Sequence, residues 1–553
     1  MASLTFLDPA CGSGNFLTET YISLRKLEDQ VLLNLMGRTY ELIESETLQI
    51  RVSIKQFYGI EINDFAVDVA KTALWIAEYQ CLQNTLDMNI PLTVPDTLPL
   101  KANDQIMVGN ALRMDWDDVV HHNKVSFIMG NPPFIGFTYM SSAQKEDMNL
   151  IFPNVKNLDY VCAWYKKASD FMMKSPIDVA FVSTNSIVQG ETVARFVKFI
   201  PDLKLIFAYK PFIWDSETKD KAQVHCVIIG FSKYEKKYKR IYDSTKHSEV
   251  NNINWYLYDF KNLIIESRPK PLSGSIPLMC YGNKPADGGN LIVEKEDFNL
   301  FSNDKTASKY LKKLTGAIEF LHNKQRWCLW LTDATPSEIK KSELIYTRVR
   351  KCAEMRKSSK ATAIQKFSET PHLFAQITQP EGVKCILIPR VSSEKRIYVP
   401  MGFIDSSTKV TDSVQLVANA TIYDFGILES IVHMAWMRVV AGRLKSDYRY
   451  SKDIVYNNFV WVKPTKQQRA NIEKSAQAII DARNKYPDSS LAELYDETCM
   501  PVELRKAHHN NDQTVLQLYG LAKNCTEDQM VARMFELYEA KISGVNNTGL
   551  ELL

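Results

Sequence analysis

The tetrapeptide Asn131-Pro132-Pro133-Phe134 contains the residue types needed to activate an exocyclic amine. Such an amine is a poor nucleophile because its lone pair is delocalised into the ring. Two acceptors that hold both amine hydrogens free that lone pair, and the Asn131 side-chain oxygen and the Pro132 carbonyl could provide them. The prolines fix φ and hold the carbonyl rigidly. The expected chemistry is methyl transfer to an amine, which needs no metal and no covalent enzyme intermediate.

The substrate that best fits this chemistry is adenine in DNA, with Phe134 stacking on the base. An amino group inside a duplex is out of reach, so the base has to be flipped out. The same four residues are also typical of a plain turn. Their position favours catalysis, because they follow an apolar run at 126–130 and lie 117 residues after the glycine of an upstream loop, Gly14.

That upstream loop, residues 8–16, predicts a nucleotide-like cofactor site. It follows the apolar run 4–7, and Gly12 and Gly14 would let a ligand approach the backbone N–H groups. Glu61, after a second apolar run, is placed to bond ribose hydroxyls. Asn110, after a third, is placed to bond an adenine ring. A tight turn with no ligand is the alternative for the loop alone, and the two polar residues at successive strand ends argue against it.

Alternating apolar runs and helical patterns predict a doubly wound α/β sheet in the first part of the chain. The expected strands are 4–7, 54–60, 104–108, 125–129, 177–183 and 223–231, and the expected helices are 16–50, 64–86 and 160–174. After residue 232 the pattern changes to a connector, 233–300, then short mixed segments, 301–462, and then a helical segment, 463–553. The predicted catalytic domain is therefore 1–232, and it is followed by a mixed α/β segment, 301–462, and by a helical domain, 463–553.

The composition is that of a globular chain, with 45% hydrophobic and 24% charged residues among 553. No apolar run is long enough to span a membrane, and the first residues lack the features of a signal peptide. The ten cysteines form no CxxC pair, so neither a zinc site nor a disulfide framework is predicted. These features favour a reducing cytoplasm.

The net charge of +3 conceals a strongly basic segment. Residues 301–470 hold 28 basic and 15 acidic residues, a net charge of +13, whereas the parts before and after are each net −5. A domain that binds a polyanion is expected to have such an excess, although a solvated lysine-rich surface is the alternative. Cations, some beside aromatic residues, suggest eight DNA-contact candidates: Arg348, Arg350, Lys351, Arg443, Lys445, Tyr448, Arg449 and Tyr450.

In the order of these features the sequence resembles the gamma class of N6-adenine DNA methyltransferases, which use S-adenosyl-L-methionine. More narrowly it resembles the MmeI-like type IIL restriction-modification proteins, in which one polypeptide carries cleavage, methylation and recognition. The narrower resemblance rests on residues 131–136, 281–290 and 442–451 and extends over nearly the whole chain. It implies a Rossmann-like class I methyltransferase fold in a prokaryotic cytoplasmic protein. Residues 301–462 would then be a mixed α/β target recognition domain that binds double-stranded DNA.

The resemblance also assigns roles to individual residues. Asn131, Pro132, Pro133 and Phe134 would hold the target base, Glu61 the ribose of the cofactor and Asn110 its adenine. Asp159 matches a further motif near the methionine end of the cofactor. The full set expected around S-adenosyl-L-methionine is Asp8, Ala10, Cys11, Gly12, Gly14, Asn15, Phe16, Glu61, Ile62, Asn110, Ala111 and Asp159.

The sequence departs from the family at its beginning. Only seven residues precede Asp8, so a cofactor motif that lies there in the gamma class is missing, as are the N-terminal nuclease and its helical spacer. A fragment of a longer protein, with a nuclease on the same native polypeptide, is one expectation. Two alternatives stay open: a DNA-binding specificity module with an incomplete, inactive methyltransferase half, and a methyltransferase that acts on protein glutamine or RNA. Cytosine N4 also remains chemically possible as the target.

Overall fold

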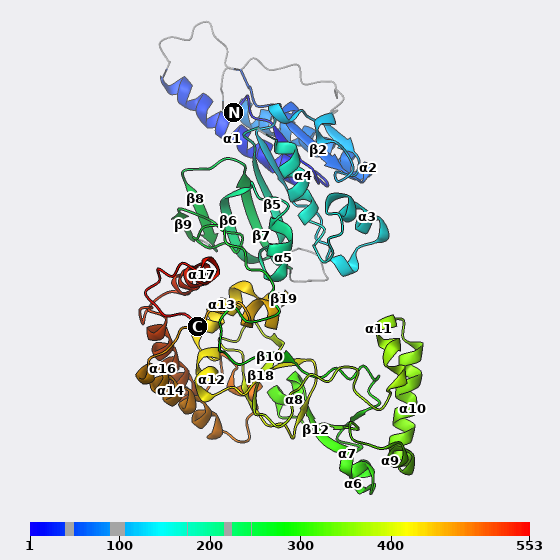
Figure 1. Cartoon of the computed structure of the whole chain (residues 1–553). Coiled ribbons are helices and arrows are strands. Elements are labelled where there is room, and N and C mark those ends of the chain that lie inside the picture. The colour runs from blue at the N-terminus through cyan, green and yellow to red at the C-terminus, as the bar shows by residue number, and fades with distance from the viewer. Residues whose placement is uncertain (39–48, 89–104, 174, 215–223, 245) are drawn as a thin grey trace. The chain divides into compact units, whose positions relative to one another are not determined.

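The computed structural model describes residues 1–38, 49–88, 105–173, 175–214, 224–244 and 246–553. These form two compact units, Met1–Ile264 and Ile265–Leu553 (Figure 1). Each unit has its own sheets and its own buried core. Within the described ranges, no helix combines the length and the apolar character needed to cross a bilayer.

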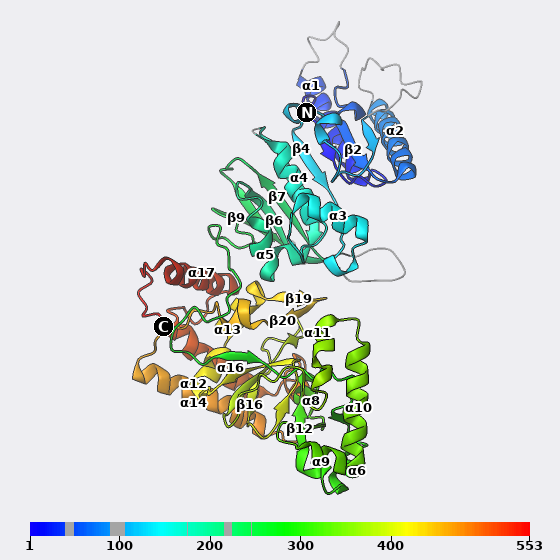
Figure 2. The same ribbon diagram turned by 45° about the vertical axis from the view of Figure 1, so that its right-hand side comes forward.

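The first unit is built on a nine-stranded sheet of order β3-β2-β1-β4-β5-β7-β6-β8-β9 (Figure 2). Strands β1 to β5 are parallel, and β7 runs antiparallel to both β5 and β6. The predicted α/β fold is thereby confirmed. The strands are β1 (Phe6–Asp8), β2 (Phe57–Glu61), β3 (Ile106–Val108), β4 (Phe127–Gly130), β5 (Asp178–Thr184), β6 (Lys204–Trp214), β7 (Val224–Ser232), β8 (Lys239–Asp243) and β9 (Lys246–Val250).

Helices between these strands bury the apolar side chains of the sheet. Leu17 and Tyr21 from α1 pack with Leu74 from α2 on Phe6 and Phe57 of the sheet. The start of α2 is set locally, because the Asn63 side chain accepts the backbone N–H of Ala66 at 3.2 Å. The helices of this unit are α1 (Asn15–Arg38), α2 (Asp64–Asp87), α3 (Ser142–Ile151), α4 (Cys162–Met172) and α5 (Gly190–Val197).

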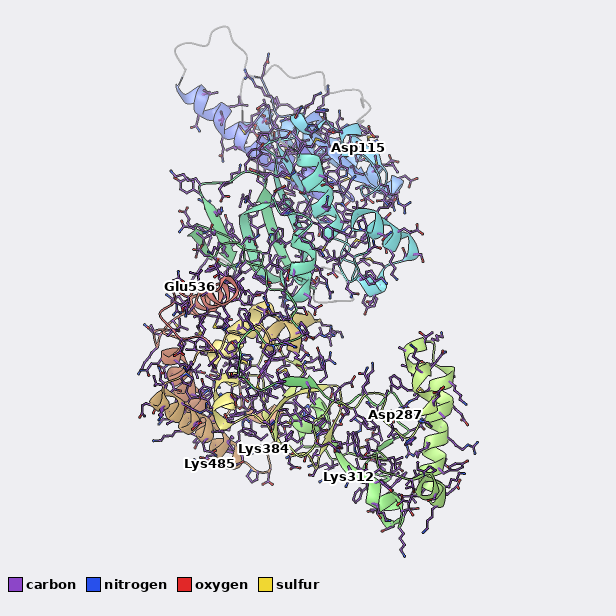
Figure 3. All side chains as sticks on the ribbon, viewed as in Figure 1. Asp115, Asp287, Lys312, Lys384, Lys485 and Glu536 are labelled. Atoms are coloured by element: carbon purple, nitrogen blue, oxygen red, sulfur yellow. The ribbon has the colours of Figure 1, made fainter. Side chains whose placement is uncertain are left out.

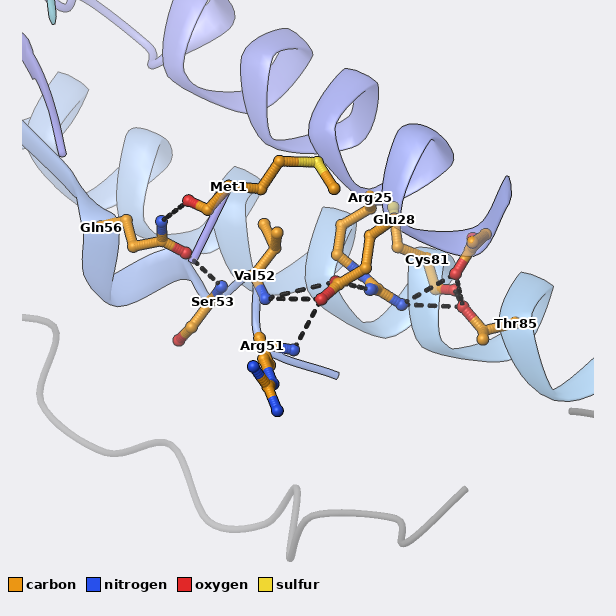
Figure 4. Close-up of polar contacts among 10 residues, drawn as sticks. Met1, Arg25, Glu28, Arg51, Val52, Ser53, Gln56, Cys81 and Thr85 are labelled. Atoms are coloured by element: carbon orange, nitrogen blue, oxygen red, sulfur yellow. Dashed lines mark hydrogen bonds and ion pairs between the residues drawn. The ribbon is translucent and has the colours of Figure 1, made fainter. Parts of the chain in front are cut away.

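A buried charged cluster fixes α1 to α2 (Figure 4). The Arg25 guanidinium, fully buried, binds Glu28 and Asp29 on its own helix and donates to the Thr85 hydroxyl of α2 at 2.8 Å. Glu28 also accepts the backbone N–H groups of the chain that leads into β2, at Arg51 and Val52. Because a buried charge is tolerated only when it is paired and bonded, this cluster specifies how the two helices pack.

The second unit contains three small sheets, of order β10-β18-β14-β16, β11-β13-β12-β17 and β15-β20-β19. Several paired strands lie far apart in the sequence. The strands are β10 (Met279–Tyr281), β11 (Ile292–Val293), β12 (Leu311–Thr315), β13 (Trp327–Leu329), β14 (Cys385–Pro389), β15 (Val391–Ser392), β16 (Gly402–Ile404), β17 (Lys409–Val410), β18 (Val414–Ala418), β19 (Gly442–Leu444) and β20 (Asp447–Arg449).

The helices of the second unit form two groups. A short series follows β11: α6 (Phe298–Asn303), α7 (Ala307–Tyr310), α8 (Ala317–His322), α9 (Pro336–Lys341), α10 (Glu343–Ser358) and α11 (Thr362–Gln365). A later group consists of α12 (Ile422–Leu428), α13 (Ile431–Val440), α14 (Lys466–Asn484), α15 (Leu491–Leu494), α16 (Val502–Leu518) and α17 (Glu527–Ser543).

Two predicted domain edges fall inside packed structure. Strands β8 and β9 continue the nine-stranded sheet past residue 232, where the sequence pattern ends the catalytic domain. Helices α12 and α13 precede residue 463 and yet pack with the later helices, since Gly426 lies against Ile472 and Trp436 against Phe535. The predicted helix 16–50 ends at Arg38 among the described residues, and 39–48 lie outside them.

Candidate active site and nucleic-acid interface

The glycine loop connects β1 to α1 as the sequence predicts. Gly12 and Gly14 both have positive φ, +53° and +83°, a conformation that side-chain-bearing residues rarely adopt. A Cβ on Gly14 would lie 2.9 Å from the Cβ of Ala70, so this glycine also lets α2 approach the loop. The backbone of the loop is therefore both turned and crowded in a way that only glycine satisfies.

Glu61 stands at the end of β2 and holds the loop from the neighbouring strand. One carboxylate oxygen accepts the Gly12 N–H at 3.0 Å, and the other accepts the Asn63 N–H at 3.0 Å. Each oxygen keeps a second lone pair for another donor. The residue predicted to hold a ribose is thus next to the loop and already fixed in orientation.

Asp8, the last residue of β1, is a buried carboxyl with one free oxygen. Its Oδ1 accepts the Ala10 N–H at 3.0 Å, whereas its Oδ2 is buried without a partner among the described residues. Burial raises the pKa of Asp8 to about 7; the Ala10 hydrogen bond opposes this shift, and the nearby Glu61 carboxylate adds to it. Gly130 at the end of β4 packs on this carboxyl, because a Cβ there would lie 2.6 Å from Oδ1.

Asn110 follows β3 and belongs to a network that the sequence did not reveal. Its Oδ1 accepts the Leu112 N–H at 2.9 Å, and its Nδ2 donates to Asp147 of α3 at 3.1 Å. Asp147 also accepts from Arg113 and from the Tyr160 hydroxyl, at 2.5 and 2.7 Å. Burial favours a higher pKa for Asp147, but these three hydrogen bonds outweigh it and hold the pKa below its usual value.

The catalytic tetrapeptide lies directly after β4, the strand next to β1 in the sheet. The Asn131 Oδ1 is buried and accepts no hydrogen bond within the described part of the chain. Pro132 is buried and Phe134 is half-buried. An acceptor that is shielded from water and left free of protein donors is the arrangement that holding an amine requires.

Asp159 connects the chain after the tetrapeptide to the end of β5. Its Oδ2 accepts from the Thr184 hydroxyl at 3.1 Å and from Ser186. The next residue, Tyr160, donates its N–H to the Ile135 carbonyl at 2.9 Å. The segment that follows Asn131–Phe134 is thereby held in place by residues from β5.

The other predicted cofactor residues lie in the same region, around the ends of β1, β2 and β3. Cys11 is buried, its N–H donates to the Ile60 carbonyl at 3.1 Å, and burial raises the pKa of its thiol. The remaining positions are Ala10 and Phe16, both half-buried, Asn15 and Ile62, both exposed, and Ala111, which is buried. Their predicted contacts with a cofactor stay predictions.

A possible cation site was not predicted. Among the described residues, Asp117, His121 and His122 offer ligand atoms that all lie within 4.8 Å of one another. They precede β4, whereas the tetrapeptide follows it, so they lie toward the opposite edge of the sheet. The His122 ring already bonds Asp117 at 2.9 Å, which explains the group as an ordinary loop contact.

Four of the eight predicted DNA-contact residues are exposed. Arg350 and Lys351 project from α10, and the Arg350 guanidinium lies over the Tyr346 ring and forms a 3.9 Å ion pair with Glu354 on the same helix. Lys445 forms the turn of the β19–β20 hairpin with φ +56°, and Arg449 lies on the outer face of β20. These four cations are free to meet a phosphate.

Two predicted DNA contacts are wrong in this structure, namely those of Tyr448 and Tyr450. Successive strand residues alternate between faces, so Tyr448 and Tyr450 share one face while Arg449 takes the other. That face is internal: Tyr450 is 1% exposed and its hydroxyl lies 2.8 Å from the His433 ring nitrogen. Tyr448 is also buried, beneath the Arg443 guanidinium at 3.7 Å. Both tyrosines pack the domain.

Two predicted DNA-contact arginines are occupied by protein partners. Arg443 donates to the Ser446 carbonyl at 2.7 Å and pairs with Glu394 at 3.4 Å. Arg348 pairs with Asp297 at 2.7 Å and lies over the Phe301 ring. Both guanidinium groups are mostly buried, so they stabilise local structure in this conformation.

A fifth arginine, Arg356 at the end of α10, was counted in the basic segment and is completely buried. All five of its N–H donors are used by backbone carbonyls, those of Pro285, Ala286, Phe367, Thr370 and Leu373, at 2.8–3.0 Å. Close by, the Asp287 carboxylate, labelled in Figure 3, accepts the N–H groups of Gly289 and Leu291 at 3.1 and 2.5 Å. The segment 281–290, which carries part of the family resemblance, is therefore a structural hub.

Together the sheet order, the glycine loop after β1 and the Asn-Pro-Pro-Phe segment after β4 define the first unit as a class I methyltransferase domain. The comparisons with known proteins agree. Sequence models of three MmeI domains match: the DNA-methyltransferase domain at residues 1–243, the target recognition domain at 259–463 and the C-terminal domain at 462–545.

Individual relatives cover nearly the whole chain. A solved structure of the type IIL restriction-modification enzyme MmeI in complex with DNA superposes with a TM-score of 0.86 at 40% identity, over 98% of this chain and 73% of that one. DNA methyltransferase A of Bacillus subtilis (strain 168) is 37% identical over 551 residues, 98% of this chain. The chain belongs to the MmeI family, and it spans 61% of the length of the Bacillus relative.

Proposed function

We propose that this chain transfers a methyl group from S-adenosyl-L-methionine to N6 of a flipped-out adenine in a specific double-stranded DNA sequence, as part of a type IIL-like restriction-modification protein. The observation that carries the proposal is the buried Asn131 Oδ1 after β4, one strand away from the glycine loop, which has no hydrogen-bond partner among the residues that the structure describes. Membership of the MmeI family and the DNA complex of that relative support it.

The residues around the loop fit the proposed cofactor. Each carboxylate oxygen of Glu61 keeps a lone pair that can accept a ribose hydroxyl. The Asp8 Oδ2 is buried and has no partner among the described residues, so this carboxyl group can interact with a positively charged ligand. When bound, S-adenosyl-L-methionine supplies an electrophilic methyl group on a sulfonium. Asn110 and Ala111 at the end of β3 would lie against the adenine ring, and Asp159 nearer the methionine end.

The tetrapeptide performs the step on the base side. The Asn131 Oδ1 and the Pro132 carbonyl accept the two amine hydrogens and localise the lone pair on nitrogen. Phe134 stacks on the extruded ring, and the rigid prolines keep both acceptors in register. The amine loses a proton after methyl transfer, and the same two oxygens are the first acceptors that it meets. Arg350, Lys351, Lys445 and Arg449 would bind the phosphates of the duplex.

The test is methyl transfer from labelled S-adenosyl-L-methionine to mixed-sequence duplex DNA, with the product nucleoside identified by mass. We expect N6-methyladenine from the wild-type chain and at least a thousandfold loss, roughly, in Asn131→Ala, with DNA binding retained. Asn84→Ala, which removes an exposed amide from α2, is the matched control and should be as active as wild type. Near-wild-type activity of Asn131→Ala would remove the proposed role of this residue.

A different product would redirect the proposal. N4-methylcytosine would change the target base while keeping the mechanism. If the chain binds DNA but neither transfers a methyl group nor binds the cofactor, the specificity-module alternative is favoured. Calorimetry with S-adenosyl-L-methionine measures the cofactor binding directly.

A further inference from the structure

One buried carboxylate of the first unit, Asp147 on α3, accepts three side-chain hydrogen bonds. The Asn110 Nδ2 and the Tyr160 hydroxyl donate to its Oδ2 at 3.1 and 2.7 Å, and the Arg113 Nε donates to its Oδ1 at 2.5 Å. Burial of Asp147, which is 3% exposed, favours a higher pKa, but these hydrogen bonds outweigh burial and hold the pKa below its usual value. At neutral pH the group is therefore ionised, and it can only accept hydrogen bonds.

A buried carboxylate with several donors also occurs far from any predicted site. Asp512 on α16 accepts from the Tyr398 hydroxyl at 2.5 Å and from the Ile431 N–H at 2.8 Å, and none of these residues is a candidate for cofactor or DNA binding. Bonding alone therefore does not make such a group functional. Asp147 differs because one of its donors, Asn110, is a cofactor candidate just after β3.

Asn110 lies beside Glu61, the predicted ribose ligand, at the carboxyl edge of the sheet. Val108, the last residue of β3, pairs with Glu61 in the parallel register, and the Gly109 N–H donates to the Glu61 carbonyl at 2.8 Å. In open α/β sheets, ligands bind at this edge of the parallel strands. Asn110 is half-buried, so a ligand can reach part of this residue.

Asp147 is also connected to the catalytic segment and to the glycine loop. Tyr160, one of its donors, donates its own backbone N–H to the Ile135 carbonyl, just past the tetrapeptide, at 2.9 Å. The Tyr160 ring packs edge-on against the Trp164 ring, with 5.2 Å between the centroids. The Trp164 Nε1 donates to the Pro9 carbonyl in the glycine loop at 3.0 Å. The carboxylate thus belongs to the group of side chains that holds the candidate site together.

Two contacts determine which way the Asn110 amide points. The Leu112 N–H can only donate, so it contacts the Asn110 Oδ1, at 2.9 Å. The Asp147 carboxylate can only accept, so it contacts the Asn110 Nδ2. An amide turned by half a rotation would place its oxygen against the carboxylate and its NH₂ group against the Leu112 N–H, and both contacts would be repulsive. In the observed orientation the Asn110 Oδ1 keeps one lone pair for a further donor.

We propose that Asp147 is a positioning residue that keeps the oxygen of the Asn110 amide, rather than its nitrogen, available to the 6-amino group of the cofactor's adenine, an inference that rests on the proposed function. The amine of adenine is a donor, and the free lone pair of the Asn110 Oδ1 accepts it. Hypoxanthine has a carbonyl oxygen at the same position, so two acceptors would face each other with no hydrogen between them. Asp147 thereby selects adenine without touching it.

The test compares the affinities of two cofactor analogues by calorimetry. S-adenosyl-L-homocysteine keeps the base and ribose of the cofactor and lacks its transferable methyl group, and S-inosyl-L-homocysteine has hypoxanthine in place of adenine. We expect the wild-type chain to prefer the adenosyl compound by roughly tenfold or more, the cost of one unpaired polar contact. Asp147→Ala should lose most of this preference and match Asn110→Ala. The variant with both changes should lose no more than Asn110→Ala alone, because the two residues act as one unit.

An exchange of the two side chains tests the same role without deleting either group. Asn110→Asp alone places two carboxylates together, so it should bind the adenosyl compound more weakly than wild type does. Adding Asp147→Asn reverses the polarity of the hydrogen bond, because the amide at position 147 then donates to the carboxylate at position 110. The exchange variant still presents an oxygen to the amine, and it should regain the adenosyl preference to within about threefold of wild type.

Neighbouring groups provide matched controls. Glu146→Ala removes an exposed carboxylate of the same helix, 3.7 Å from the Arg113 guanidinium, and leaves the contact between Asp147 and Asn110 in place. Tyr160→Phe removes another donor of the network and also leaves that contact in place. Both variants should keep the wild-type preference, even if Tyr160→Phe melts at a lower temperature. A preference between two ligands separates positioning from a general loss of stability.

The outcomes distinguish the inference from the proposed function. If wild type has no adenosyl preference, if Asp147→Ala keeps it, or if the exchange variant does no better than Asn110→Asp, Asp147 does not orient the amide and the inference is overturned while the proposed function stands. If Asp147→Ala does not fold, the exchange variant decides alone. If the wild-type chain binds neither S-adenosyl-L-methionine nor S-adenosyl-L-homocysteine, the proposed function fails and takes this inference with it.

Discussion

Asp8 is a carboxyl with a strongly shifted pKa at the candidate site. Its carboxyl is buried at the end of β1, and burial raises its pKa to about 7, so it is largely protonated below neutral pH in the free protein. A bound cation stabilises the carboxylate over the neutral acid. Binding of a cationic cofactor below the pKa must therefore release a proton, and this requirement makes affinity depend on pH.

We predict that affinity for S-adenosyl-L-methionine rises with pH up to about 7 and then levels off, falling up to about tenfold per pH unit below it. Asp8→Asn should bind more weakly at pH 8 and should lose the pH dependence in this range. Asp68→Asn, a change at an exposed position of α2, serves as the control. Calorimetry from pH 5.5 to 8.5 measures both slopes, and a wild-type affinity that is flat with pH would contradict the prediction.

The sequence located some of these residues and could not locate others. Asp8, Glu61 and Asn131 were predicted because each comes at or just after the end of an apolar run that forms a strand. Parallel strands have their carboxyl ends at the same edge of a sheet, so these residues were expected to lie together. Asp147 was missed because nothing in its local pattern distinguishes it. What identifies Asp147 is a set of three donors brought from other parts of the fold, which is a property of the folded chain.

At the scale of elements, predictability follows the length and regularity of the apolar pattern. Strand β5 and helix α2 were predicted within a few residues, since one is a continuous apolar run and the other a long helical repeat. Strand β6 was missed, because Lys210 and Pro211 interrupt its pattern and most of its residues are partly buried or exposed. In the second unit β10 pairs with β18, more than 130 positions away, and no local pattern encodes such a pairing.

Helix α10 shows how one buried cation can fix several loops. It begins at the Ser342 cap and ends near Arg356, whose five donors bind carbonyls on both sides of the helix end. We predict that Arg356→Met lowers the free energy of unfolding of this unit by about 3 kcal/mol or more, because five buried carbonyls lose their donor. Arg356→Lys should cost nearly as much, since an ammonium cannot reach the same set.

The matched control for that prediction is Arg350→Met on the same helix, where the guanidinium is exposed and its ion pair is weak. This change should shift stability by no more than about 0.5 kcal/mol. Urea unfolding followed by tryptophan fluorescence compares the variants, with Trp330 lying in the same buried cluster as α10. Equal midpoints for Arg356→Met and Arg350→Met would show that the carbonyl cage is not important to the fold.

On the scale of the whole molecule, charge is distributed unevenly along a nearly neutral chain. The segment 301–470 has a net charge of +13, but the structure divides its cations into two kinds. Some, such as Arg356 and Arg443, are hydrogen-bonded to backbone carbonyls or paired with carboxylates within the domain. Others, such as Lys351 and Lys445, are exposed. Only the second kind can displace counterions from DNA, so the total charge overstates the number of phosphate contacts.

We predict that simultaneous replacement of the four exposed candidates, Arg350, Lys351, Lys445 and Arg449, by alanine weakens DNA binding on all sequences and lowers the slope of log K against log salt. Each phosphate contact removed should reduce that slope by about one. The matched control removes the same charge from the part of the chain after residue 470, by replacing Lys474, Lys485, Lys506 and Lys523, all exposed, with alanine. Because that part of the chain is net negative, its variant should keep the wild-type slope.

Fluorescence anisotropy with a labelled duplex at 50–300 mM salt, roughly the range in which such slopes are measured, distinguishes the two variants. Equal slopes for both variants would mean that overall charge, rather than these four positions, attracts the DNA.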